Sequence, residues 1–207
     1  MDNKIAIIDY GVGNLFSLCS SLDYIGAAAV VTSDADEIRK AARIILPGVG
    51  AFADAAEKLR ASGLDRVLIE EAANGKPIMG ICLGMQMLFD RSFEYGEHEG
   101  LGLIKGDVVA MDGVIPAELK IPHIGWNALR FKGSVKHPLF KYINEGDCVY
   151  FVHSFFADNC AESVVADTEY GAPITAAVAS GNVMGCQFHP EKSGDVGLAI
   201  LRAFAEL

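Results

Sequence analysis

Residues 77–89 read Pro-Ile-Met-Gly-Ile-Cys-Leu-Gly-Met-Gln-Met-Leu-Phe, an apolar run with two glycines around one cysteine. The pattern Gly80-x-Cys82-x-Gly84 has the form of a nucleophile elbow, the sharp strand-to-helix turn that exposes a Ser or Cys at the top of an α/β sheet. Small residues are needed there because Cβ atoms would clash where the backbone approaches itself. We expect the helix after Cys82 to direct its N–H groups and positive dipole end at the sulfur, which favours a thiolate. The alternative is a buried structural cysteine. A catalytic role for Cys82 therefore requires a base and an orienting group from elsewhere in the chain.

The segments before this turn alternate between short apolar runs and amphipathic patterns. They predict strands at residues 4–9, 28–31, 43–46 and 77–82, and helices at residues 15–25, 34–42 and 51–73. Such alternation through Gly-rich junctions predicts a parallel sheet with helices on both faces. Ligands bind these sheets beyond the carboxyl ends of the strands, where both Cys82 and the loop 47–50 are expected.

The second half of the chain, from about Gly100, favours short strands over helices. We expect a closing helix from about Asp195 to Glu206, capped by Ser193 or Asp195. No linker or internal repeat separates the halves, so residues 1–207 are expected to form one α/β domain, a mostly parallel central sheet with a smaller antiparallel extension. The strands expected in this half are 107–111, 119–121, 128–131, 148–153, 163–166, 174–179 and 183–188.

Composition narrows the class of protein. With 51% hydrophobic and 21% charged residues among 207, the chain is expected to be compact and globular. A net charge of -10 argues against general nucleic-acid binding and against attachment to an anionic membrane. We expect no signal peptide and no membrane span. The cysteines lack a C-x-x-C pair, which argues against a disulfide framework or zinc site and favours a cytoplasmic location; they are Cys19, Cys82, Cys148, Cys160 and Cys186.

Two glycines near the N-terminus suggest a dinucleotide-binding loop. Gly11-x-Gly13 follows the first strand, but the third glycine of that fingerprint would fall on Phe16. A tight strand-to-helix turn explains these glycines, and we expect no nucleotide cofactor.

The best partners for Cys82 lie in the segment His189-Pro190-Glu191. A catalytic thiolate needs a base, and that base needs an orienting group. Pro190 biases His189 toward extended geometry, in which side chains two residues apart share a face. His189 and Glu191 can then lie side by side, with one imidazole nitrogen left for the sulfur. His-Pro-Glu by itself is also compatible with a surface turn.

The other histidines give weaker signals. His123 and His153 could line the site, while His98 and His137 fall in loops. No pair has metal-ligand spacing, so we expect no metal.

Taken together, these motifs resemble those of the class I (triad-type) glutamine amidotransferases. Residues 80–86 are similar to the family's nucleophile motif, His189-Pro190-Glu191 to its His-x-Glu pair, and residues 47–50 to its oxyanion strand. The resemblance implies the flavodoxin-like fold of this family and a catalytic triad of Cys82, His189 and Glu191.

The resemblance also implies further site residues. Backbone N–H groups of Val49 and Leu83 would form the oxyanion hole, and no cofactor would be needed. The residues implied to hold L-glutamine are Gly50, Gln86, Ser154 and Phe155.

Within the family, several segments resemble the glutaminase subunits of imidazole glycerol phosphate synthases of histidine biosynthesis; they are residues 8–15, 46–52, 121–127, 150–154 and 187–193. This implies a heterodimer in which ammonia passes to a (β/α)₈-barrel cyclase subunit. Asn14, Trp126 and Lys192 would lie at or near that interface. Phe155 and Phe156 depart from the usual aromatic hydroxyls, and Cys186 replaces a usual aliphatic residue.

Three alternatives stay open at this stage. The ammonia acceptor could instead belong to pyridoxal phosphate, purine or aminobenzoate synthesis, although residues 9–15 and 123–127 favour histidine biosynthesis. A cysteine peptidase on a related fold shares the elbow, but nothing in the sequence indicates a peptide cleft. An interaction subunit with an inert triad is the third alternative.

Overall fold

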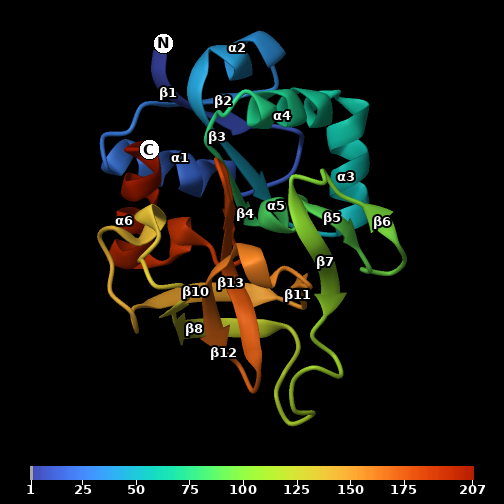
Figure 1. Ribbon diagram of the computed structural model, residues 1–207. Helices are drawn as coiled ribbons and strands as arrows, with labels where there is room; N and C mark the ends of the chain where they lie inside the picture. The colour runs from blue at the N-terminus through green and yellow to red at the C-terminus, as the bar shows by residue number, and fades with distance from the viewer. Residues whose placement is uncertain (1) are drawn as a thin grey trace.

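The computed structural model describes residues 2–207, and its largest sheet has eight strands in the order β2-β1-β3-β4-β14-β13-β12-β9 (Figure 1). The five strands from β2 to β14 are parallel, and the last three are antiparallel. The mostly parallel sheet predicted from the sequence is confirmed. Its strands are β1 (Asp2–Ile8), β2 (Ala29–Thr32), β3 (Ala41–Gly48), β4 (Ile78–Cys82), β9 (Arg130–Phe131), β12 (Val164–Glu169), β13 (Pro173–Ser180) and β14 (Val183–Cys186).

Two smaller sheets extend the large one. An antiparallel pair consists of β8 (His123–Ala128) and β10 (Cys148–His153). A four-stranded sheet has the order β11-β7-β5-β6, in which only β5 and β7 run parallel. Its strands are β5 (Phe89–Ser92), β6 (His98–Glu99), β7 (Ile104–Ala110) and β11 (Phe155–Asp158).

Helices cover both faces of the large sheet, as predicted. Figure 1 shows α1 and α6 on one side and α3 and α4 on the other. Side chains alternate along a strand, and β1 accordingly sends Ile5 and Ile7 into the core under α1 and α6. Ala6 and Ile8 enter the core under the opposite helices. The helices are α1 (Leu15–Tyr24), α2 (Ala35–Lys40), α3 (Phe52–Ala61), α4 (Leu64–Ala73), α5 (Leu83–Gln86) and α6 (Gly194–Ala205), with 3-10 turns η1 (Pro138–Phe140), η2 (Ala161–Ser163) and η3 (Pro190–Lys192).

The single helix predicted over residues 51–73 is wrong. The chain breaks into α3 and α4 at Ser62-Gly63, where Gly63 adopts a left-handed φ of 73°. This conformation is open to glycine and ends the first helix. The amphipathic pattern continues across the break because both helices pack on the same face.

The helix expected after Cys82 is much shorter than its sequence suggests. α5 ends at Gln86, and Phe89 already begins β5, whose partner is β7. Similarly, the helix predicted over residues 34–42 stops at Lys40 because Ala41 begins β3. Pairing with distant strands outweighs local helix propensity in both places.

Several strand boundaries also differ. Residues 119–121 form a loop, and the strand expected at 128–131 begins earlier, as β8, with the short β9 after it. The last strand ends at Cys186 instead of Phe188. Ser193 does occupy the N-cap of α6, but its hydroxyl donates to the carbonyl of His189 at 2.6 Å instead of capping the helix.

Candidate active site

Cys82 lies at the carboxyl end of β4 in a strained turn. Its φ of 54° falls in the left-handed region that side chains other than glycine rarely adopt, at a cost of order 1–3 kcal/mol. Only 8% of the residue is exposed, and it faces a cavity of about 290 Å³. This volume is near the lower end of the range for small-molecule sites, roughly 300–1,000 Å³.

The glycines around Cys82 are required by packing, as the sequence pattern indicates. A Cβ atom on Gly84 would overlap the carbonyl oxygen of Leu46 in β3. A Cβ atom on Gly80 would lie 2.6 Å from the backbone nitrogen of Met85. The elbow thus presses α5 directly against β3 and β4.

The predicted stabilisation of the sulfur by a helix N-terminus is weakened by the length of α5. Four residues make one turn, and a macrodipole requires several aligned peptide units. Side chains around the sulfur must therefore contribute more than the sequence indicates.

His189 and Glu191 lie in the segment after β14, on either side of Pro190, and form the expected pair. Nδ1 of His189 is 2.8 Å from Oε1 of Glu191, and each side chain is only 3% exposed. His189 is extended, but Pro190–Lys192 form the 3-10 turn η3 and not the extended segment predicted. The turn still places the two side chains together, so the ring's Nδ1 donates to the carboxylate.

The electrostatics of His189 favour a charged ring. Burial alone would lower its pKa, but the neighbouring Cys82 and Glu191 outweigh burial and raise the pKa to about 9. The imidazolium form is therefore stabilised between the sulfur and the carboxylate.

The loop that follows β3 forms part of the cavity wall beside Cys82. Gly48 pairs in register with Cys82, and Val49, Gly50 and Leu83 all line the cavity. The hydroxyl of Tyr10 donates to the carbonyl of Pro47 at 2.8 Å and fixes the start of this loop. The predicted oxyanion residues Val49 and Leu83 therefore line the same cavity as Cys82.

The remaining predicted substrate residues also line the cavity. Gln86, Ser154 and Phe155 form part of its wall. Nε2 of Gln86 donates to the carbonyl of Phe155 at 3.0 Å and to Oε1 of Gln187 at 2.9 Å. Gln86 thus holds the 154–155 segment in place as well as facing the cavity.

Three residues of the cavity wall, Glu94, Tyr95 and Val152, are not among the site residues predicted from the sequence. Glu94 and Tyr95 lie between β5 and β6 and line the cavity. Oε2 of Glu94 accepts from the backbone nitrogen of Phe52 at 2.6 Å, which ties the loop to the start of α3. The tyrosine next to an acidic residue in a loop was the available signal.

Of the two histidines that could line the site, only His153 does so. Its Nδ1 donates to the carbonyl of Phe155 at 2.8 Å, and its Nε2 lies 3.1 Å from Nδ1 of His123 behind it. Burial lowers the pKa of His153 to about 4 and also lowers that of His123. Both rings are therefore mainly neutral near pH 7 and brace the 154–155 segment.

The three predicted interface residues lie near this end of the molecule. Lys192 lines the active-site cavity, and Asn14 lines a small adjoining cavity together with Glu191. Trp126 on β8 is 55% exposed and packs edge-on against Tyr150.

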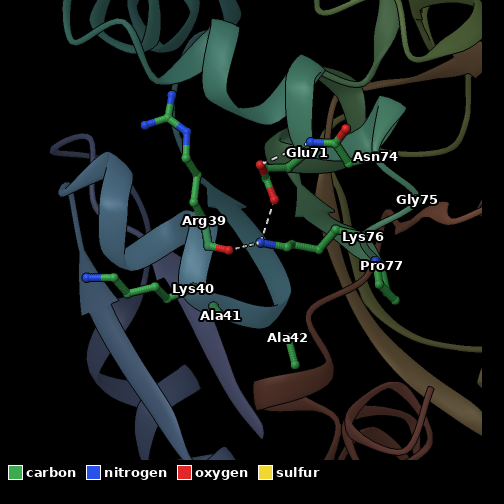
Figure 2. Close-up of a pocket in the computed structure, with 9 residues that line it drawn as sticks. All are labelled: Arg39, Lys40, Ala41, Ala42, Glu71, Asn74, Gly75, Lys76 and Pro77. Atoms are coloured by element: carbon green, nitrogen blue, oxygen red, sulfur yellow. Dashed lines mark hydrogen bonds and ion pairs between the residues drawn. The ribbon is translucent and has the colours of Figure 1, made fainter. Parts of the chain in front are cut away.

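A larger hollow of about 680 Å³ lies at the opposite end of the parallel strands, where β3 and β4 begin. Figure 2 shows Lys76 inside it, bonded to the carbonyl of Arg39 at 2.7 Å and to Glu71 at 2.5 Å. The side chains of Arg39 and Lys40 point away from that ammonium. The hollow contains an internally satisfied ion pair and neither a cysteine nor a histidine, so its lining lacks the groups of the elbow site.

Two further properties concern the whole described chain. Among residues 2–207, no group of three or more His, Cys, Asp or Glu side chains could hold a metal ion. Within the same residues, no helix is long and apolar enough to cross a membrane.

Comparison with known proteins places this geometry in a family. The family model described as "Glutamine amidotransferase class-I" matches residues 6–206. The chain is 48% identical over 204 residues to the imidazole glycerol phosphate synthase subunit HisH of Oceanobacillus iheyensis, covering 98% of both chains. It is 50% identical to the HisH subunit of Caldanaerobacter subterraneus, again over 98% of both, and 49% identical to that of Methanosarcina acetivorans, over 99% and 98%.

Solved structures agree on the fold. A crystal structure of a glutamine amidotransferase superposes with a TM-score of 0.74 at 19% identity, covering 98% of this chain and 99% of that one. The structure of PurLQS from Thermotoga maritima gives a TM-score of 0.76 at 21% identity, over 100% and 99%. With a family match over nearly its whole length and close relatives of the same class, the chain belongs to the class I glutamine amidotransferases.

Proposed function

We propose that this chain is the glutaminase subunit of an imidazole glycerol phosphate synthase. It hydrolyses L-glutamine to glutamate and ammonia and passes the ammonia to a (β/α)₈-barrel cyclase, which forms imidazole glycerol phosphate and aminoimidazole carboxamide ribotide in histidine biosynthesis. The observation that carries the proposal is that Cys82 and His189 line one cavity, with Glu191 bound to the His189 ring at 2.8 Å. The near full-length similarity to HisH subunits supports the choice of acceptor.

The first half of the reaction is attack on the amide. The Cys82 thiolate bonds to the side-chain carbonyl carbon of glutamine, and the oxygen gains the negative charge. Backbone N–H groups of Val49 and Leu83 stabilise that oxyanion, usually a large term in catalysis. His189 gives its proton to the amide nitrogen, the C–N bond breaks, and ammonia leaves a glutamyl thioester on Cys82.

The second half is hydrolysis of the thioester. The neutral His189 removes a proton from water, and the resulting hydroxide attacks the thioester carbonyl. Glutamate leaves, and the proton on His189 restores the ion pair with the sulfur. Glu191 accepts from Nδ1 throughout and so keeps Nε2 directed at the reacting atoms.

Substrate recognition follows from the cavity wall. Gly50, Gln86 and the backbone of Ser154 and Phe155 hold the glutamine. We expect the α-ammonium group to lie beside Glu94, because that side chain is a carboxylate on the same wall.

The cyclase is expected to bind at the end of the molecule that carries the active site. Trp126, Asn14 and Lys192 lie at or near the interface of the heterodimer, and the ammonia leaves toward it. The family match over residues 6–206 supports one glutamine amidotransferase domain spanning residues 1–207. The near full-length similarity to biosynthetic HisH subunits supports a cytoplasmic location.

The acceptor can be tested by mixing the chain with candidate partner synthases. With the cyclase and its ribonucleotide ligand, glutamate release is expected to rise about tenfold or more, because partner binding completes the site. The matched controls are synthases for pyridoxal phosphate, purines and aminobenzoate, measured at equal concentrations. Stimulation by one of those alone would overturn the choice of acceptor while leaving glutamine hydrolysis intact.

The raised pKa of His189, about 9, predicts the alkaline limit of activity. The ring can protonate the leaving nitrogen only while it is charged, so kcat/KM for glutamine should fall as pH rises through about 9. Glu191→Gln removes the anion that favours the charged ring. The pH at which kcat/KM falls on the alkaline side should then be lower by about one unit, and kcat/KM itself should also be lower.

The measurement is kcat/KM between pH 6 and 10 in the complex. Glu206→Gln is the matched control. Glu206 lines a hollow at the start of β1, at the end of the strands opposite to the active site. An unchanged alkaline limb in Glu191→Gln would show that the carboxylate does not act through the ring.

A further inference from the structure

The Cys82 sulfur has a second polar neighbour besides His189. Nε2 of Gln187 lies 3.7 Å from Sγ of Cys82, within hydrogen-bonding range for sulfur. Gln187 is fully buried, directly after β14, and its backbone nitrogen donates to the carbonyl of Ala176 at 2.8 Å. Gln187 is thus fixed in position beside the turn that carries Cys82.

The orientation of the Gln187 amide follows from its neighbours. The backbone carbonyl of Phe155 can only accept, so Gln86 must present its NH₂ group to it. The same nitrogen lies 2.9 Å from the Gln187 side chain, which must therefore present its oxygen. The oxygen of Gln187 is thereby engaged as an acceptor. Its NH₂ group is the only end left to face the sulfur, and an NH₂ group can only donate there.

A donor aimed at sulfur distinguishes between thiol and thiolate. Hydrogen bonds to charged groups are stronger than those to neutral groups, so the N–H stabilises the anion more than the S–H form. The one-turn α5 has little dipole of its own, so a side-chain donor can make a large share of the thiolate stabilisation.

We propose that Gln187 stabilises the Cys82 thiolate by donating a side-chain hydrogen bond to its sulfur, and that Gln86 fixes the Gln187 amide in the donating orientation. The inference rests on Cys82 acting as the nucleophile. It gives Gln187 a role in the reaction beyond the triad, and it connects the sulfur through Gln86 to the Phe155 carbonyl in the substrate wall.

The test is the reaction of Cys82 with iodoacetamide, which requires the thiolate. The rate is followed from pH 5 to 10 by mass spectrometry of the peptide that contains Cys82, since the exposed Cys148 also reacts. Gln187→Met removes the donor but keeps the length of the side chain. The rate at pH 7 is expected to fall about tenfold, and its pH midpoint to rise by roughly one unit.

Three further variants separate this role from simple damage to the fold. Gln187→Glu keeps the shape but replaces the donor by an acceptor, and it should slow alkylation at least as much. Gln86→Met should raise KM for glutamine through Phe155 and slow alkylation less than Gln187→Met does. Asn182→Ala removes a half-buried amide that donates to the carbonyls of Ala72 in α4 and Lys76 just before β4, and it should leave alkylation unchanged.

The outcomes are distinct. A higher alkylation midpoint in both Gln187 variants, with unchanged circular dichroism, supports the proposal. An unchanged midpoint in a folded Gln187→Met or Gln187→Glu variant overturns it, even if kcat falls. If Cys82 proves dispensable for glutamine hydrolysis, the proposed function fails, whatever the alkylation result.

Discussion

Replacing Cys82 with alanine is expected to abolish glutamine hydrolysis in the complex with the cyclase, lowering kcat by about 10⁴-fold or more. In the proposed mechanism the sulfur is the only protein atom that bonds to the substrate carbon, and alanine offers nothing in its place. The neighbours of Cys82 should keep their positions, because the elbow is held by the glycines and by the pairing of β3, β4 and β14.

The measurement is glutamate release under saturating glutamine, with the cyclase present. The cyclase reaction supplied with external ammonium salt is the control, and it should continue at the wild-type rate. His189→Ala should cost about as much as Cys82→Ala, and the double variant little more than either, because the two groups act as one unit. Activity retained in Cys82→Ala would mean that the nucleophile is another group.

Gly84→Ala is expected to have the largest effect on folding stability. Its added Cβ would overlap the carbonyl of Leu46, a backbone atom that cannot rotate away. Overpacking of this kind costs typically 1–3 kcal/mol and more where backbone must move, so we expect a loss of about 3 kcal/mol or more. The displaced α5 would also move the Leu83 N–H away from the proposed oxyanion hole, and glutaminase activity should be lost in the folded fraction.

Urea unfolding measures the effect, with Gly113→Ala as the matched control. Gly113, unlike Gly84, has a left-handed φ of 78°, but its Cβ would meet open space. That variant should lose only about 1–2 kcal/mol, the cost of a left-handed side chain. If Gly84→Ala were no less stable than Gly113→Ala, the close approach of α5 and β3 would not constrain the elbow.

The sequence indicates the parallel framework because short apolar runs alternate with amphipathic helical patterns in the first half of the chain. It also indicates Cys82, His189 and Glu191, since their motifs are local and chemically specific. The break at Gly63 was hidden, because the apolar pattern continues through it. The length of α5 was hidden as well, because pairing of β5 with the distant β7 decides where the helix ends.

The parts of the site that escaped the sequence depend on long-range contacts. Gln86 and Gln187 are 101 residues apart, and no local pattern marks them as a pair. Glu94 and Tyr95 reach the cavity only because their loop is tied to the start of α3. The short α5 and the buried Gln187 are related in function. The one-turn helix has little dipole to stabilise the Cys82 thiolate, and the Gln187 side chain provides a hydrogen-bond donor instead.

The most direct test of the central claim is to trap the glutamyl thioester. The complex with the cyclase, turning over ¹⁴C-glutamine, is quenched in acid and digested, and its peptides are analysed by mass spectrometry. We predict a hydroxylamine-sensitive glutamyl group on the peptide containing Cys82, and none in Cys82→Ala. Label on another residue, or turnover with no label on Cys82 at any quench time, would contradict the account.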